Sequence, residues 1–205
     1  MAERPLPDQE PITMNVTRIR ALRGPNLWNR RTAIEAIVEC EPDDLAAAAV
    51  EAAALESCAL SLQQEAGCAV SFSRTAATRE PGVFQVIVEY SEEAVGRLAL
   101  DLAIEACAAE RGTGSFDRAA AIARLRELDE DERLGPSTGS IVDAAVARGI
   151  PYRRLTQGSL VQFGWGSRQR RIQAAEVDQT SAIAESIAQD KELTKSLRRS
   201  SETGA

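Results

Sequence analysis

The feature that most constrains the fold is the Ala-rich stretch from Leu45 to Gln64. Its larger apolar side chains recur with roughly the 3.6-residue period of an α-helix, and Gly67 follows as a stop signal. Only 4% of the residues are aromatic, so large rings contribute little to a core. Small Ala side chains let a helix pack closely on its neighbours. The sequence therefore favours closely packed Ala-rich helices over an aromatic-filled barrel.

Three segments have the alternating apolar and polar pattern of half-buried strands. Asn15–Leu22 and Val83–Tyr90 fit this pattern, whereas Ala33–Cys40 fits a strand and a helix nearly equally well. A shorter strand is expected in Cys68–Arg74. Together with the Ala-rich helices, these strands predict an α/β fold of the α+β type, with a small mixed sheet covered by helices.

Start and stop signals place three further helices in the chain. They are Ser91 to about Ala109 with Ser91 as the N-cap, the charged helix Phe116–Arg133 with a solvated face, and Pro136–Gly149. From Tyr152 the sequence changes to short strand-like pieces. Two helical pieces are expected near the end, at 180–189 and 190–198.

The expected organisation is one domain followed by a short additional region. Pro151 cannot continue the helix that ends at Gly149, which places a boundary there. The Pro-rich start and the polar end are expected to be disordered. The predicted segments are 1–14 (disordered lead-in), 15–150 (domain), 151–198 (strand-rich region) and 199–205 (disordered tail).

The chain contains no histidine. Histidine is the commonest general base and zinc ligand, so Ser-His and Cys-His catalysis are excluded within these residues and a zinc hydrolase is not expected. The cysteines form no Cys-x-x-Cys pair, and each lies in an apolar stretch. Buried, reduced thiols are therefore expected at Cys40, Cys58, Cys68 and Cys107.

Charge and hydropathy limit the partners. The net charge is −7 and the isoelectric point is about 4.9, which argues against nucleic acid as a partner. No apolar run approaches the roughly 18 residues of a membrane helix. The acidic, Pro-rich start lacks the apolar segment of a signal peptide. A cytoplasmic location without a membrane partner is expected.

A first candidate site lies in Leu22–Glu39, LRGPNLWNRRTAIEAIVE. Its Gly-Pro turn is surrounded by Arg23, Trp28, Arg30 and Arg31. The pattern fits either a binding corner or a solvated hairpin.

A second candidate site lies in Gln157–Ala174, QGSLVQFGWGSRQRRIQA. Its glycines allow tight turns, and Ser159 begins a strand. Arg168, Arg170 and Arg171 are placed to gather anions. The alternative is a Gly-turned β-hairpin with its basic side chains in solvent. The glycine spacing matches neither a P-loop nor a dinucleotide-binding loop.

Five segments resemble the cyanophycin synthetase family in order and in spacing. They are Val16–Trp28, REPGVFQVIVEY (Arg79–Tyr90), LGPSTGSIVDAAVARGIP (Leu134–Pro151), GSLVQFGWGSRQRRIQA (Gly158–Ala174) and TSAIAESIAQDKELTK (Thr180–Lys195). The family makes cyanophycin, a poly-aspartate chain that carries an arginine on each side-chain carboxylate. The resemblance implies an N-terminal domain that binds and presents this polymer, followed at 151–198 by the incomplete start of an ATP-grasp domain.

In the family, the ATP-grasp domain uses ATP and Mg²⁺ to add aspartate, and a Mur-ligase-like domain adds arginine. The residues that bind nucleotide and metal lie beyond the end of this chain. The resemblance therefore implies a cyanophycin-binding region of a nitrogen-storage pathway, with no cofactor and no catalysis of its own. Two alternatives stay open: a piece of a complete ligase, and an assembly subunit that associates with itself or with full-length synthetase.

The resemblance also implies polymer-binding residues. Ser159 matches a position that clamps the C-terminal end of the polymer, where a hydroxyl and turn N–H groups hold a carboxylate. The Arg that completes this clamp in the family lies downstream of this chain. For Trp28, the alternatives are stacking on a guanidinium of the polymer and burial between the domain and the ATP-grasp start. The candidate residues are Gly158, Ser159, Gln162, Arg168, Arg23 and Trp28.

One family site is predicted to be lost. Many members carry His-x-x-Glu-His, an inverted zinc-hydrolase motif, and resemble hydrolases that trim the polymer. This chain has Ala53, Glu56 and Ser57 at those three positions. A lone carboxylate does not hold zinc, so no metal site is expected. Glu56 is predicted to be a solvated helix residue without a partner.

Overall fold

The computed structural model describes residues 14–40, 45–156, 158–174, 176–179, 191 and 195. Its contacts divide the chain into two compact units, with the division between Arg133 and Leu134. Each unit has its own sheet and its own apolar core.

The first unit contains a four-stranded antiparallel sheet with the strand order β1-β2-β4-β3. Its strands are β1 (Met14–Leu22), β2 (Ala33–Cys40), β3 (Ser73–Ala77) and β4 (Val83–Glu89). A bulge between Val16 and Arg18 interrupts the register of β1 with β2. The extra residue shifts the alternation of side chains by one. Val16 and Ile19 therefore lie on the same face although they are three residues apart.

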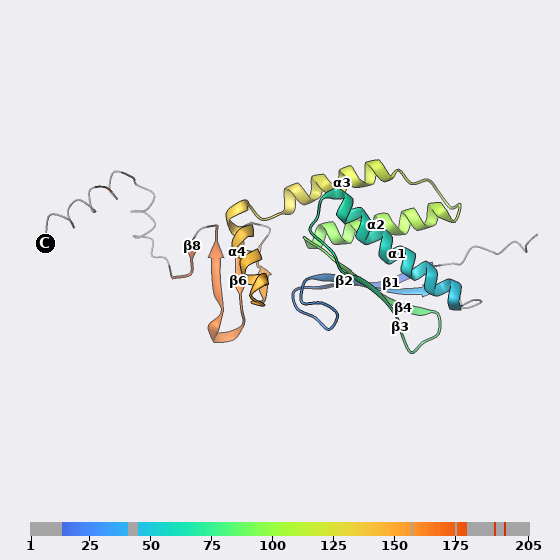
Figure 1. Ribbon diagram of the computed structural model, residues 1–205, viewed down its shortest axis with the longest axis horizontal. Coiled ribbons are helices and arrows are strands. Elements are labelled where there is room, and N and C mark those ends of the chain that lie inside the picture. The colour runs from blue at the N-terminus through green and yellow to red at the C-terminus, as the bar shows by residue number, and fades with distance from the viewer. Residues whose placement is uncertain are drawn as a thin grey trace, which may run out of the picture. The chain divides into compact units, whose positions relative to one another are not determined.

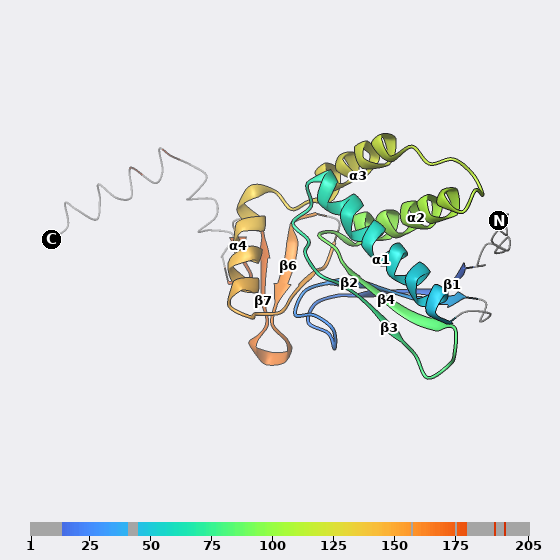
Figure 2. The ribbon, with the colours of Figure 1, turned by 45° about the vertical axis from the view of Figure 1, so that its right-hand side comes forward.

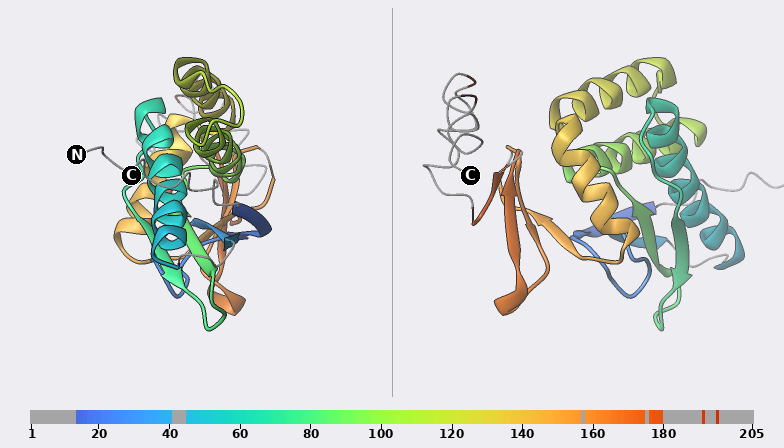
Figure 3. Two further views of the ribbon diagram at one scale, coloured as in Figure 1. Left: turned by 90° about the vertical axis from the view of Figure 1, so that its right-hand side faces the viewer. Right: turned by 60° about the vertical axis from the view of Figure 1, so that its left-hand side comes forward.

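Helices α1 (Leu45–Ala66) and α2 (Glu93–Glu110) cover one face of this sheet, and α3 (Arg118–Glu132) packs against both of them. Figures 1 and 3 show the three helices together on one side of the strands. The covered face is apolar, because alternate residues of β4 such as Phe84 and Val86 belong to the core. The larger buried residues of α1 are Leu55 and Leu62, and the other buried apolar ones are alanines. This composition allows α1 to lie close to the sheet.

Helix α1 is long and apolar enough, by length and composition alone, to cross a membrane. This finding differs from the expectation that no segment of the chain reaches that limit. In the structure Leu55 and Leu62 are fully buried against the sheet and the other helices. Gly67 ends the helix with a φ of 100°, a conformation that favours glycine. Helix α1 is therefore a core helix of the first unit.

Close packing also fixes the start of α2. Gly96 faces Tyr90 so closely that a Cβ at position 96 would lie 2.5 Å from the Cβ of Tyr90. Carbon atoms normally approach no closer than about 3.5 Å. Glycine at this position therefore allows α2 to turn back over the end of β4.

The second unit consists of one helix and a second antiparallel sheet with the order β5-β6-β7-β8. Its elements are α4 (Pro136–Ala147), β5 (Tyr152–Arg154), β6 (Leu160–Phe163), the 3-10 helix η1 (Gly166–Arg168), β7 (Arg170–Gln173) and β8 (Glu176–Val177). Figure 2 shows α4 beside β6 and β7. Val142 of α4 packs against Val161 and Ile172 of these strands. The unit is thus built on a small core.

The predicted α+β class is confirmed, and so is a sheet covered by Ala-rich helices. The described strand pairs of this sheet are antiparallel, whereas a mixed sheet was expected. Two local predictions are wrong. The strand expected in Cys68–Arg74 begins only at Ser73. Ser91 does not cap α2, because its hydroxyl donates to Asp129 of α3 at 3.1 Å and Glu92 is the N-cap.

The helix expected at Pro136–Gly149 is α4, which belongs by its contacts to the second unit. The expected domain limits, 15–150 and 151–198, stay predictions. The expected disordered ends and the helical pieces at 180–189 and 190–198 lie outside the described residues, apart from Met14, Lys191 and Lys195.

All four cysteines are free thiols, as expected, but only three are fully buried, because Cys58 is partly exposed. Burial, together with the neighbouring Cys58, raises the pKa of the Cys107 thiol to about 11. We expect Cys107 to resist alkylation by iodoacetamide at a pH near the ordinary thiol pKa of about 8.5, because the thiolate is the nucleophile. Peptide mass mapping of native and urea-unfolded chain tests this. Labelling of native Cys107 at the unfolded rate would contradict it.

Candidate functional site

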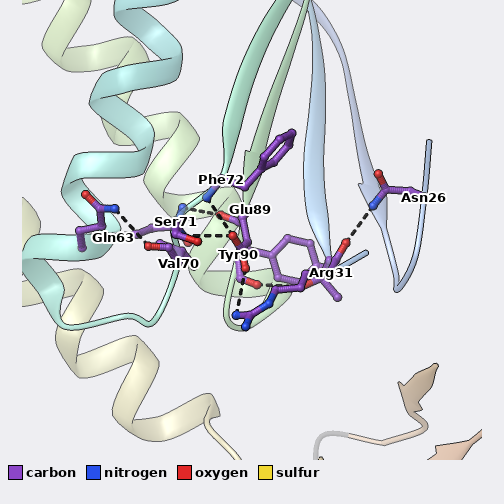
Figure 4. A network of polar contacts seen from close by, with 10 residues as sticks. Asn26, Arg31, Gln63, Val70, Ser71, Phe72, Glu89 and Tyr90 are labelled. Atoms are coloured by element: carbon purple, nitrogen blue, oxygen red, sulfur yellow. Dashed lines mark hydrogen bonds and ion pairs between the residues drawn. The ribbon is translucent and has the colours of Figure 1, made fainter. Parts of the chain in front are cut away.

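The turn between β1 and β2 is organised by the side chain of Asn26. Its Oδ1 accepts hydrogen bonds from the backbone N–H groups of Trp28 and Asn29, both at 2.9 Å. Its Nδ2 donates to the carbonyl oxygens of Gly24 at 3.1 Å and Arg31 at 2.9 Å. Figure 4 shows Asn26 reaching across the turn to Arg31. One amide therefore satisfies four backbone groups and fixes the turn that carries the predicted residues.

Arg23, a predicted polymer contact, is held within the first unit. Its Nε and Nη2 donate to the carboxylate of Glu93 at 2.6 Å and 3.2 Å, and Arg97 donates to the same carboxylate. The hydrogen bond from Arg23 lowers the pKa of Glu93, and the same contact raises the pKa of Arg23. Arg23 thus ties the end of β1 to the first turn of α2.

Trp28, the other residue predicted in this turn, is half-buried. The guanidinium carbon of Arg74 lies 5.5 Å from the centroid of its ring, within the range of a cation–π contact. The ring therefore already faces a cation, which comes from β3 of the same unit.

The sheet face that points away from α1, α2 and α3 carries charges of both signs. Residues directly paired across an antiparallel sheet share a face. Arg20 is paired with Glu35, Glu35 with Ile87, and Ile87 with Arg74, so these residues form one row across all four strands. The rows on either side add Arg18 and Glu89. We call this side of the sheet the charged face; its charged residues are Arg18, Arg20, Glu35, Arg74 and Glu89, and Ile87 between them is fully buried.

The cations and the carboxylates of the charged face differ in exposure. Arg18, Arg20 and Arg74 are exposed, whereas Glu35 is 5% and Glu89 is 2% exposed. Nη2 of Arg20 lies 2.7 Å from Oε2 of Glu35. A buried carboxylate is stable only with compensating partners. The surface therefore presents guanidinium groups to solvent over carboxylates that lie beneath them.

Glu89 has more partners than Glu35, and Figure 4 shows those of Glu89. Its Oε2 accepts hydrogen bonds from the backbone N–H groups of Ser71 at 3.1 Å and Phe72 at 2.9 Å. Its Oε1 accepts a hydrogen bond from Arg31 at 3.3 Å, and its backbone carbonyl accepts one from Gln63 of α1 at 2.9 Å. The carboxylate joins β4 to the segment before β3 and to the β1–β2 turn, and the backbone carbonyl joins β4 to α1. The role of Glu89 is structural.

The second group of predicted residues lies in the second unit. Gly158 donates its N–H to Thr156 Oγ1 at 3.2 Å, and its carbonyl accepts a hydrogen bond from Arg154 at 2.9 Å. Nε2 of Gln162 donates to the carbonyl of Gly164 at 3.3 Å. Ser159 is half-buried directly before β6, and Arg168 is exposed at the end of η1. Arg23 and Trp28 belong to the other unit, so the six predicted residues form two separate groups.

A row of polar side chains crosses the second sheet next to these residues. Arg153 of β5 is paired with Gln162, and Gln162 with Arg171 of β7. Val161 and Ile172, which alternate with them, pack against α4. The row therefore lies on the face away from α4, where two guanidinium groups flank one amide.

Comparison with known proteins gives a family match that lies within the first unit. Residues 29–109 match the family described as "Cyanophycin synthase-like N-terminal domain". The chain is similar to the N-terminal region of cyanophycin synthetases. Cyanophycin synthetases of Trichormus variabilis and of a Nostoc species are each 40% identical to it over 146 residues, which is 70% of this chain. That of Geminocystis herdmanii is 39% identical over 144 residues, or 69%. These matches cover 16% of the length of each relative.

The resemblance to cyanophycin synthetase is thus confirmed, and the matched family segment includes β2, α1, β3 and β4. It contains Glu56, which stands where the family's hydrolase motif is predicted to have been lost. Glu56 accepts hydrogen bonds from Ser73 Oγ at 2.6 Å and Thr75 Oγ1 at 2.5 Å. The prediction of a solvated residue without a partner is wrong, because Glu56 ties α1 to β3. Ala53 and Ser57 are exposed on α1.

Sequence reasoning missed the charged face of this cyanophycin synthetase-like domain. The signal was present in the β1 segment NVTRIRAL, where Arg18 and Arg20 are two residues apart and therefore share a face. In the same way, the alternation in the β2 segment AIEAIVEC assigns Glu35 to one face of its strand. Pairing these segments as a hairpin would have brought cations and carboxylates together. Arg74 could not have been placed without the register of β3.

We predict a pH-dependent effect of Arg23→Ala on stability. Because the pKa of Glu93 is lower in the folded chain, the stabilisation is present above the ordinary Glu pKa of about 4.3 and is lost as the pH falls below it. At neutral pH the variant should lose about 0.5–1 kcal/mol, since Arg23 is largely exposed and solvent screens the pair.

Urea unfolding of wild type and Arg23→Ala at neutral and acid pH measures this, with exposed Arg30→Ala as the control. The loss should shrink in acid. A loss of equal size at every pH would show that the Glu93 carboxylate is not its cause.

Proposed function

We propose that this chain binds cyanophycin as a non-catalytic part of cyanophycin synthesis, and that the charged face is its main contact surface. The observation that carries the proposal is the row of Arg20, Glu35, Ile87 and Arg74, which runs across all four strands of the first sheet. The similarity to this family supports it, since the matched relatives are named cyanophycin synthetases.

The chemistry of the polymer fits such a surface. Each arginine is joined through its α-amino group to a side-chain carboxyl of the aspartate backbone, so it keeps a free carboxylate and a free guanidinium. Every repeat therefore carries both charges. Exposed arginines such as Arg18 and Arg20 can bind the carboxylates in paired hydrogen bonds. The carboxylate of Glu35, one strand spacing of about 4.8 Å from Arg20, can bind a guanidinium group of the polymer.

The second unit extends the proposal to the end of the polymer. Ser159 and the row of Arg153, Gln162 and Arg171 offer a hydroxyl, an amide and two guanidinium groups. Such groups suit a terminal carboxylate. The start of an ATP-grasp domain, a cytoplasmic location and contact between this unit and the polymer are parts of the same proposal.

The proposal assigns no ATP and no Mg²⁺ to the residues of this chain. Within the described part of the chain, no group of three or more His, Cys, Asp or Glu side chains is placed to hold a metal ion. We therefore assign no step through ATP or Mg²⁺ to these residues.

Sedimentation with insoluble cyanophycin tests the proposal. We expect the chain to pellet with the polymer at low salt and to be released as salt screens the charges. Arg18→Glu should weaken retention roughly fivefold, because reversal of an exposed charge removes an attraction and adds a repulsion of about 1 kcal/mol in total.

The matched control is Arg124→Glu on α3, which is also exposed and changes the net charge equally. Its retention should stay at the wild-type level. Absence of pelleting by the wild-type chain at low salt would refute the proposal, and an equal loss in both variants would refute the charged face as the surface.

A further inference from the structure

Glu35 is a buried carboxylate on the sheet face that α1, α2 and α3 leave uncovered. It is 5% exposed, and the nearest cation is Arg20, at 2.7 Å. Arg20 is the only cation that forms an ion pair with Glu35 in the described part of the chain. A carboxylate with so little hydration requires a cation beside it. The carboxylate of Glu35 therefore needs one positive group beside it on the charged face.

Arg20 supplies this positive group, but its guanidinium is only weakly held at Glu35. It lies on the edge strand β1, and its side chain is 52% exposed. Within the described residues, no aligned N–H···O hydrogen bond joins it to Glu35, whereas two such bonds join Arg23 to Glu93. If Arg20 turns away, its guanidinium enters water at small cost, since half-exposed ion pairs contribute little. The buried carboxylate then stays behind and accepts another cation.

Glu89 gives the contrast within the same face. Two backbone N–H groups, from Ser71 and Phe72, donate to it in addition to Arg31. These backbone groups cannot leave, so loss of its arginine leaves the charge of Glu89 compensated. Of the two buried carboxylates, Glu35 is the one whose partner can be exchanged.

We propose that Glu35 is a binding site for an alkyl guanidinium and that Arg20 fills this site in the free chain. A guanidinium suits the site better than an ammonium, because its planar fork of N–H groups matches a carboxylate. The inference deepens the proposed function and rests on it for the natural ligand, which is the arginine side chain of the polymer.

An exchange of partners then keeps every charge paired. The guanidinium of one polymer repeat takes the place of Arg20 on Glu35, and the released Arg20 is free to bind the carboxylate of the same repeat. One internal ion pair is replaced by two pairs with a single zwitterionic unit. The site is thus selective for a ligand that carries both groups on one residue.

The exchange predicts that removal of an arginine strengthens binding of a cation. Agmatine, which has a guanidinium and no carboxylate, isolates the Glu35 half of the site. In the full chain, Arg20→Ala should bind agmatine about fivefold more tightly than wild type, because the internal competitor is gone. Calorimetric titration measures this, with cadaverine, a diamine of similar length, as the control ligand.

Thermal unfolding gives a second readout if Arg20→Ala folds poorly. Glu35 lacks its cation in that variant, so agmatine should raise the Tm of Arg20→Ala more than that of wild type, and cadaverine should not. Arg118→Ala is the matched control, since it frees Glu65 from an ion pair on the helical side of the first unit. Glu35→Gln should lose agmatine binding in either background.

Equal agmatine affinity in wild type and Arg20→Ala, or binding that survives in Glu35→Gln, would overturn the inference. Either result would leave the proposed function intact as long as the wild-type chain still pellets with cyanophycin. Tighter agmatine binding by Arg20→Ala in a chain that does not pellet would establish the guanidinium site and refute the polymer as its ligand.

Discussion

The first unit depends on the burial of one carboxylate, that of Glu89 at the end of β4. The charge of Glu89 is compensated by Ser71, Phe72 and Arg31, and these three residues lie outside β4. Each charge-assisted hydrogen bond of this kind contributes about 1.5–3 kcal/mol relative to an unsatisfied group. The carboxylate therefore holds the approach to β3 and the β1–β2 turn at fixed positions. Because the turn and the strands are fixed, the backbone positions that carry the arginines of the charged face are fixed as well.

This arrangement explains which parts of the structure could be predicted from the sequence. Local signals predicted the long Ala-rich helix, its end at Gly67 and the strands β1, β2 and β4, because spacing and stop signals act over neighbouring residues. Ser91 was misassigned as a cap, since its hydroxyl finds Asp129, which is 38 residues away. Glu56 was misassigned for the same reason, because Ser73 and Thr75 reach it from another element. Contacts between distant segments decide these roles, and no local pattern encodes them.

The candidate site shows the same limit. Arg23 and Trp28 were picked out by their place around the Gly-Pro turn and by the family resemblance, yet the structure pairs each of them within the first unit, with Glu93 and Arg74. The charged face was missed because it depends on register across four strands, including the bulge in β1. The family resemblance rested on segments that match the family in order and spacing, and it was confirmed. The polymer contacts that it implies at Ser159 and its neighbours stay predictions.

The central claim is that the charged face, and not the helical face, meets the polymer. Nuclear magnetic resonance with a short, soluble Asp-Arg oligomer and isotope-labelled chain tests this most directly. Side-chain signals of Arg20 and Arg74 and backbone signals of β1 and β2 should shift together on titration, while those of exposed α3 residues stay in place. Shifts confined to α3 and the outer surface of α1, with β1 unchanged, would contradict the account.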